Sequence, residues 1–157
     1  MSITLPDLLL STPRATTETA SRIGACLISG DTLLLHGDIG AGKSYFARAL
    51  IQSLQDHPED VPSPTFTLVQ TYETKSGEIW HADLYRLSDP SEAEELGLTE
   101  AFSSAICLIE WPERLASLAP KGALSLHFQY TDNDDQRSLS FTGGSDTLRT
   151  RISRAIT

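Results

Sequence analysis

The sequence has few of the residues that characterise disulfide-bonded, metal-binding and membrane proteins. Its two cysteines, Cys26 and Cys107, lie in apolar surroundings far apart in the sequence, so we expect both to be reduced core residues. No segment approaches the roughly 20 apolar residues of a membrane-spanning helix. The N-terminal segment has an apolar patch but lacks a basic leader, and we therefore expect the protein in the cytoplasm.

Positive charge is also scarce. Lysine and arginine number 12 against 21 aspartates and glutamates, which gives a formal net charge of −9. A polyanion would be repelled overall, so tight independent binding to nucleic acid is disfavoured. Arg149, Arg151 and Arg154 form the one basic cluster, which we interpret as a solvated helix end that complements the helix dipole.

The order of hydrophobic patterns indicates an α/β protein with one domain over residues 1–157. Helical spacing predicts helices over residues 16–29, 44–54, 89–98 (continuing through 102) and 145–156, the last capped by Ser145 or Asp146. Alternating or continuous apolar runs predict strands over residues 31–36, 65–73, 78–87, 105–111, 123–131 and 137–143. The second and third strands form one predicted hairpin, and the last two form another.

The segment "GDIGAGKS", residues 37–44, lies between a predicted strand and a predicted helix. It matches the phosphate-loop pattern G-x-x-x-x-G-K-[ST] in the structural context that this pattern requires. Glycines let several backbone N–H groups converge on phosphate oxygens, and the helix start adds unpaired N–H groups. The predicted nucleotide contacts are Gly37, Asp38, Ile39, Gly40, Ala41, Gly42, Lys43 and Ser44. The alternative is a glycine turn that binds nothing.

ATP is the expected nucleotide. Guanine selection in switch-type GTPases uses an N-K-x-D motif, and neither Lys75 nor Lys121 stands in one. Lys43 would neutralise the terminal phosphates, and the Ser44 hydroxyl is a ligand for Mg²⁺.

A second magnesium-binding acid is expected at the end of a neighbouring buried strand. Glu110 closes the apolar run "AICLIE" and is the best-placed candidate, although it would also suit the first solvent-exposed position after that strand. Trp111, which follows it, is either a core residue or a lid on the site.

Two further polar segments carry candidates. In "HADLYRL", alternation puts His81, Asp83 and Tyr85 on one strand face, where Asp83 is a base, a magnesium-organising group or an ion-pair partner. His81 and Asp83 lack a third ligand for a zinc site. In "SPTFT", Thr65 either senses the γ-phosphate as a switch residue or belongs to an ordinary turn.

Together, "GDIGAGKS", "SPTFTLVQTY", "HADLYRL" and "LIEWPERL" resemble the TsaE family of bacterial P-loop ATPases, which serves the synthesis of threonylcarbamoyladenosine next to the tRNA anticodon. The resemblance implies a P-loop NTPase fold with a mixed parallel and antiparallel sheet flanked by helices. It also implies weak ATPase activity alone, ATP and Mg²⁺ as cofactors, and action with the TsaD and TsaB proteins, with tRNA contacted only indirectly.

The resemblance also assigns residues by position. It implies that Ser44 and Glu110 serve Mg²⁺, that Thr65 belongs to a switch-like loop and that Asp83 is a catalytic or metal-organising acid. Trp111, Arg137 and Thr19 would lie near the nucleotide. Ser44 stands where threonine is commoner and keeps the hydroxyl; Ala82 stands where an aromatic residue is usual.

The sequence therefore predicts an ATPase whose hydrolysis resets a partner complex, with Lys43 needed for turnover. It leaves open whether Asp83 or Glu110 orients the attacking water. The alternatives are a small-molecule kinase and a binding module that uses ATP as a switch without hydrolysing it.

Overall fold

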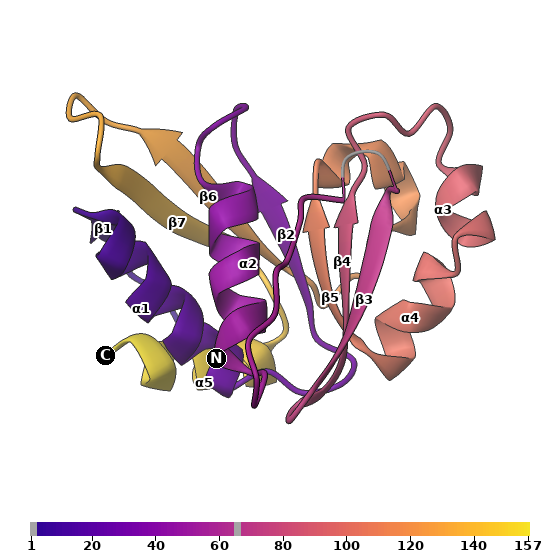
Figure 1. Cartoon of the computed structure of the whole chain (residues 1–157), viewed down its shortest axis with the longest axis horizontal. Coiled ribbons are helices and arrows are strands. Elements are labelled where there is room, and N and C mark those ends of the chain that lie inside the picture. Colours follow the sequence, from indigo (N-terminus) through magenta and orange to yellow (C-terminus); the bar gives the residue numbers. More distant parts are fainter. Residues whose placement is uncertain (1–2, 65–66) are drawn as a thin grey trace.

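A computed structural model describes residues 3–64 and 67–157. Its centre is one seven-stranded mixed sheet in the order β1-β7-β6-β2-β5-β4-β3 (Figure 1). The strands are β1 (Leu8–Leu10), β2 (Thr32–His36), β3 (Val69–Thr74), β4 (Gly77–Asp83), β5 (Ile106–Glu110), β6 (Leu124–Tyr130) and β7 (Arg137–Gly143). Strand β2 pairs in parallel with β5 and β6, and β4 pairs in parallel with β5. The pairs β3–β4, β6–β7 and β1–β7 are antiparallel.

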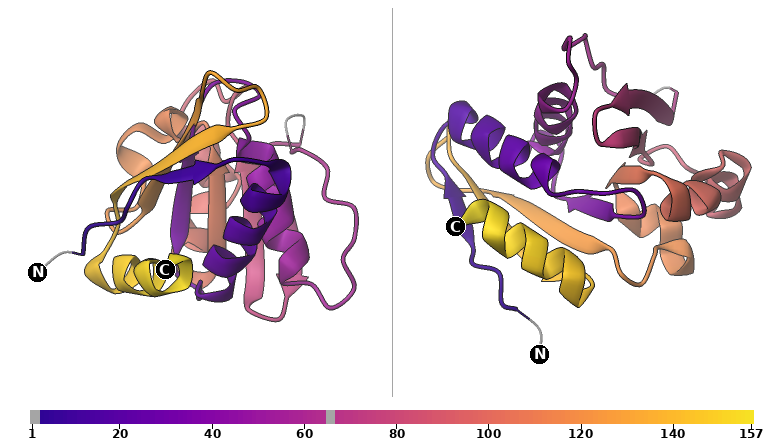
Figure 2. Two further views of the ribbon diagram at one scale, coloured as in Figure 1. Left: turned by 90° about the vertical axis from the view of Figure 1, so that its left-hand side faces the viewer. Right: turned by 90° about the horizontal axis from the view of Figure 1, so that it is seen from below.

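Helices cover both faces of the sheet. They are α1 (Pro13–Ala25), α2 (Lys43–Ser53), α3 (Ser91–Glu95), α4 (Leu98–Ser104), α5 (Asp146–Ile156) and a 3-10 segment, η1 (Pro112–Leu118). Figure 1 shows α1 and α2 side by side on one face and α3 and α4 at the other end of the sheet. Seen from below in Figure 2, α5 lies beside α1. In the described part of the chain, no helix is both long and apolar enough to cross a membrane.

The central strands are buried on both faces because alternate side chains enter two separate cores. Leu33 and Leu35 of β2 belong to the core that includes α1, α2 and α5, whereas Leu34 belongs to the core that includes α3, α4 and η1. Strand β5 alternates in the same way. The prediction that the continuous apolar runs are buried strands is thus confirmed. Because β2 and β4 both pair in parallel with β5, the carboxyl ends of these three strands lie at one edge of the sheet.

Several predicted boundaries are wrong for identifiable reasons. Helix α1 begins at Pro13, capped by the Thr12 hydroxyl, because proline suits the first helical position. The predicted helix over residues 89–98 is two helices, separated at Gly97 with φ 87°. Neither β1 nor η1 was predicted, whereas the Ser145 cap of α5 is confirmed: the Leu148 N–H donates a hydrogen bond to the Ser145 hydroxyl.

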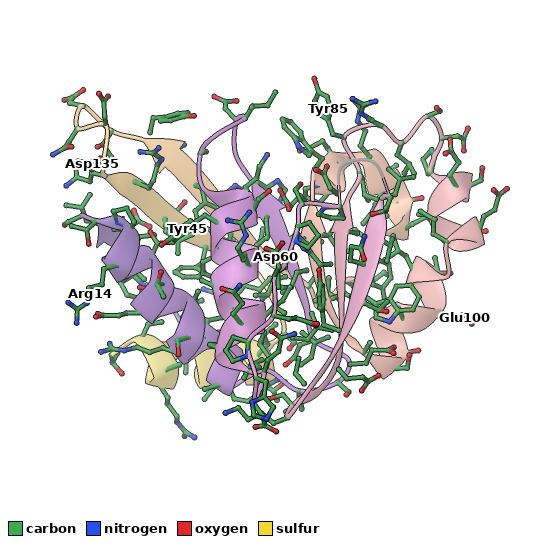
Figure 3. The ribbon with its side chains drawn as sticks, viewed as in Figure 1. Arg14, Tyr45, Asp60, Tyr85, Glu100 and Asp135 are labelled. Carbon is green, nitrogen blue, oxygen red and sulfur yellow. The ribbon has the colours of Figure 1, made fainter. Side chains whose placement is uncertain are left out.

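The predicted strand over residues 78–87 ends early, at Asp83. The Asp83 carboxylate accepts a hydrogen bond from the backbone N–H of Tyr85 at 3.0 Å, which turns the chain out of the sheet. Tyr85 is therefore exposed beyond the strand end, at the upper edge in Figure 3, and does not share a strand face with His81 and Asp83 as predicted.

The basic cluster near the C-terminus is not merely a solvated helix end. Arg151 forms two bonds with the Asp31 carboxylate, at 2.7 and 3.0 Å, and one with the Cys26 carbonyl. Arg149 bonds to the carbonyls of Ile3 and Gly143. These arginines fasten α5 to neighbouring segments, so the dipole interpretation was incomplete.

Candidate functional site

The glycine loop of residues 37–42 joins β2 to α2, as its sequence pattern predicts. A Cβ on Gly37 would lie 2.7 Å from the backbone carbonyl oxygen of Phe128, so a larger residue does not fit there. Gly42 has φ 109°, and a Cβ on it would meet nothing within 4 Å. The first N–H groups of α2 have no partner within the helix, and they begin directly beyond this open space. The loop therefore offers an anion-binding cradle at the positive end of the α2 dipole.

Ser44 and Glu110 meet beside this loop. The Ser44 hydroxyl donates a hydrogen bond of 2.7 Å to Glu110 Oε1, and Glu110 Oε2 lies 2.7 Å from Nε2 of His81. Glu110 is only 2% exposed, so its interpretation as the first solvent-exposed position after the strand is wrong. In this contact the imidazole can donate through an Nε2–H group, and the carboxylate oxygen accepts.

Asp83 ends the strand beside Glu110. The two residues are direct partners in the parallel pairing of β4 with β5, and Asp83 is also buried. Both acids therefore stand at the carboxyl edge of the sheet, where ligands of open α/β sheets bind.

Lys43 lies against Trp111. Its Nζ is 3.5 Å from the centre of the Trp111 ring and donates a hydrogen bond to the Gly37 carbonyl. Burial lowers the pKa of the Lys43 ammonium, and the nearby carboxylates, Glu110 above all, oppose that shift. Trp111 also packs on Tyr85, with ring centres 4.9 Å apart. The aromatic pair thus borders the lysine from the side of β4 and β5.

These residues surround one cleft of about 460 Å³. Its lining combines the loop and the start of α2 with the ends of β4 and β5: Ile39, Gly40, Gly42, Lys43, Ser44, Tyr45, Arg48, Ser63, Asp83, Tyr85, Arg86, Glu110 and Trp111. No cluster of three or more histidine, cysteine, aspartate or glutamate side chains could hold a metal ion in the described residues. A cation here would need ligands from a bound anion as well as from Ser44 and Glu110.

The other side of the loop is covered by the β6–β7 hairpin. The Tyr130 hydroxyl donates a hydrogen bond of 2.6 Å to the Ile39 carbonyl, and the Arg137 guanidinium donates one of 3.4 Å to the Gly40 carbonyl. Arg137 also stacks on the Tyr130 ring, 4.6 Å from its centre. A smaller hollow of about 240 Å³ opens beside them, bordered by Thr16 and Tyr45. Figure 3 shows Tyr45 reaching from α2 towards α1, and its hydroxyl lies 3.0 Å from that of Thr17.

A family model described as "Threonylcarbamoyl adenosine biosynthesis protein TsaE" matches residues 10–139. The chain is 39% identical over 134 residues to the tRNA threonylcarbamoyladenosine biosynthesis protein TsaE of Rickettsia bellii, across 85% of this chain and 92% of that protein. This chain belongs to the TsaE family. The Bacillus subtilis protein of the same name is 35% identical over 131 residues, across 83% and 80% of the two chains. The crystal structure of YdiB from Bacillus subtilis has a TM-score of 0.80 at 28% identity, across 100% and 99% of the chains.

Membership of the TsaE family confirms the resemblance that the four motifs suggested. Most of the residues predicted from those motifs lie together: Lys43, Ser44, Asp83, Glu110 and Trp111 line the main cleft, and Arg137 adjoins the loop from the other side. Thr65 lies outside the described residues.

Thr19 does not reach the cleft. It lies on α1 in a separate hollow formed with β1 and the end of α5. Thr16, three residues earlier, is the threonine that borders the loop, because three residues move a side chain about 4.5 Å along the helix axis. Two contacts at the site were not predicted: the hydrogen bond of His81 to Glu110 and that of the Tyr130 hydroxyl to the loop. The alternation in "HADLYRL" did place His81 and Asp83 on one face, which was the available signal.

Proposed function

We propose that this member of the TsaE family binds ATP with Mg²⁺ in the 460 Å³ cleft and hydrolyses it. The observation that carries the proposal is the 2.7 Å contact between Ser44 and Glu110 beside the glycine loop. Hydroxyl and carboxylate oxygens are ligands that suit Mg²⁺, which usually takes one or two protein ligands and completes its shell with phosphates and water.

The chain's own groups have distinct tasks in this proposal. The N–H groups of the loop and of the first turn of α2 bind phosphate oxygens, and Lys43 leaves Trp111 to contact the terminal phosphates. Bound Mg²⁺ would offset negative charge on the phosphates. Trp111 and Arg137 border the nucleotide from opposite sides of the loop.

Asp83 is the residue to which we assign the orientation of the attacking water. Both oxygens of Glu110 already have partners, Ser44 and His81, which suits a metal-binding acid held in one position. Asp83 lines the same cleft from the neighbouring strand. In this proposal Glu110 is the metal ligand and Asp83 orients the water.

We further propose a role in the biosynthesis of threonylcarbamoyladenosine in tRNA, together with the TsaD and TsaB proteins. The family model and the names of the relatives support the pathway. The formal net charge of −9 favours indirect action on tRNA through those partners.

The test is reconstitution of the tRNA modification with TsaD and TsaB, with and without this chain and ATP. We expect modified tRNA and phosphate release to require both, and Lys43→Ala to abolish them. ATP-dependent partner binding with phosphate release near zero would indicate a non-hydrolysing switch instead. Transfer of radiolabelled phosphate to a small metabolite would indicate a kinase.

A further inference from the structure

His81 is a buried histidine that stands outside the phosphate-loop motif. It is 1% exposed on β4, and two fully buried apolar residues share its face of the sheet: Ile79 on its own strand and its parallel partner Leu108. Burying an imidazole in such surroundings costs free energy unless its nitrogens are hydrogen-bonded. An apolar side chain would fill the same place in a fully buried strand without that cost.

Only one of the two ring nitrogens of His81 has a hydrogen-bond partner among the described residues. Nε2 lies 2.7 Å from Glu110 Oε2, whereas Nδ1 is buried without a hydrogen-bond partner in the described part of the chain. A buried polar atom left unpaired in a native protein calls for an explanation. The bond to Glu110 is the contribution of the imidazole here, since the other nitrogen stabilises nothing in the surrounding core.

Glu110 is consequently held at both oxygens. Its Oε2 faces His81, and its Oε1 accepts from the Ser44 hydroxyl at 2.7 Å. With one oxygen fixed by His81, the carboxylate cannot rotate without breaking a buried hydrogen bond. The second oxygen therefore stays directed at Ser44 and the phosphate loop.

We propose that His81 is a positioning residue: it orients Glu110 so that one carboxylate oxygen is presented, beside the Ser44 hydroxyl, to the magnesium ion that accompanies the nucleotide. The inference rests on the proposed function, because it assigns a role at the same metal site. Carboxylates that ligate metals are themselves hydrogen-bonded, and loss of such partners typically weakens metal affinity by about 10- to 100-fold.

The experiment compares His81→Met with His81→Gln. The two side chains have similar length, but only glutamine carries an N–H that can donate to Glu110. Ile79→Ala is the control, since Ile79 lies two residues away on the same face of β4 and belongs to the core rather than to the cleft. The measurements are Mn²⁺ affinity by electron paramagnetic resonance with ADP present, ADP affinity in EDTA, and the thermal unfolding midpoint.

We expect His81→Met to weaken Mn²⁺ binding by about tenfold or more. ADP affinity in EDTA should stay at the wild-type value, and His81→Gln should recover most of the Mn²⁺ affinity. Ile79→Ala should lower the unfolding midpoint and leave Mn²⁺ affinity unchanged. If His81→Met does not fold, His81→Leu replaces it in the comparison with His81→Gln.

Three results would overturn the role of His81 alone. They are wild-type Mn²⁺ affinity in His81→Met, an equal loss of Mn²⁺ and metal-free ADP binding, and an equal loss of Mn²⁺ affinity in Ile79→Ala. Failure of the wild-type chain to bind Mn²⁺ with ADP would overturn the proposed function itself, and the role of His81 with it.

Discussion

The ammonium of Lys43 lies over the indole ring of Trp111, 3.5 Å from its centre. The same ammonium donates to the Gly37 carbonyl, which places the lysine across the mouth of the loop. A cation–π contact contributes on the order of 0.5–2 kcal/mol, which is small beside the attraction of a phosphate chain. Bound nucleotide should therefore draw Lys43 away from Trp111.

The contact between Lys43 and Trp111 predicts that nucleotide binding changes tryptophan fluorescence. In a Trp80→Phe variant, where Trp111 is the remaining tryptophan, ATP with Mg²⁺ should change the tryptophan emission in a saturable way, because the cation beside the indole moves. Combining Trp80→Phe with Lys43→Met removes that cation and should give the altered emission without nucleotide. Tryptophan emission that changes neither on addition of nucleotide nor in the Lys43→Met variant would contradict the contact between Lys43 and Trp111.

The ion pair between Arg151 and Asp31 predicts a stability difference between two neighbouring arginines. Arg151→Met should lower the free energy of unfolding by roughly 2 kcal/mol, because it leaves the largely buried Asp31 carboxylate without its charged partner. Arg154, on the same helix, is exposed, and Arg154→Met should change stability by less than about 0.5 kcal/mol. Urea unfolding measures both, and equal effects would mean that the ion pair adds nothing.

The parts of the site that could be predicted from the sequence are those whose residues lie close together along the chain. The phosphate loop is a strand, a glycine loop and a helix within about twenty residues, and Glu110 ends a continuous apolar run, so local patterns sufficed. The contact between His81 and Glu110 depends on β4 lying beside β5, which spacing along the chain does not specify. Likewise, β1 is three residues long and is a strand because β7 offers it an edge. The secondary-structure propensity of a short segment cannot reveal a strand that forms only because a segment distant in the sequence pairs with it.

Two glycines of the loop should respond differently to alanine. Gly37→Ala should destabilise the fold by about 2 kcal/mol or more, because its Cβ would meet the Phe128 carbonyl oxygen at 2.7 Å. The Cβ of Gly42→Ala would meet no atom within 4 Å. This substitution should therefore lower the free energy of unfolding only by the roughly 1–2 kcal/mol that a left-handed backbone conformation costs alanine. The Gly42 variant should nevertheless lose nucleotide affinity, because its methyl group enters the space before α2.

Thermal unfolding and titration with a fluorescent ATP analogue separate these two effects. A Gly37→Ala protein as stable as the wild type would show that β6 can move away from the loop. A Gly42→Ala protein that binds the analogue normally would show that phosphates do not occupy the space in front of that residue.

His36, the residue before the loop, should make stability depend on pH. Its ring stacks on His127 with centres 4.5 Å apart, and its Nε2 lies 3.0 Å from the Ser125 hydroxyl. Burial lowers the pKa of His36, His127 lowers it further, and Glu113, 3.8 Å away, opposes the shift. The folded state therefore binds the proton less readily than the unfolded chain.

The direction of the effect follows from that difference. Above the unfolded pKa of about 6.5 both states leave His36 neutral, and its contribution to stability is complete. As the pH falls below that value the unfolded chain takes up a proton first, so stability decreases until the folded pKa is passed. Chemical unfolding between pH 7.5 and 5 should thus show a shallower pH dependence in His36→Gln than in the wild type. His57→Gln, at an exposed position, is the matched control; an unchanged slope in His36→Gln would show that the stacked pair does not carry the dependence.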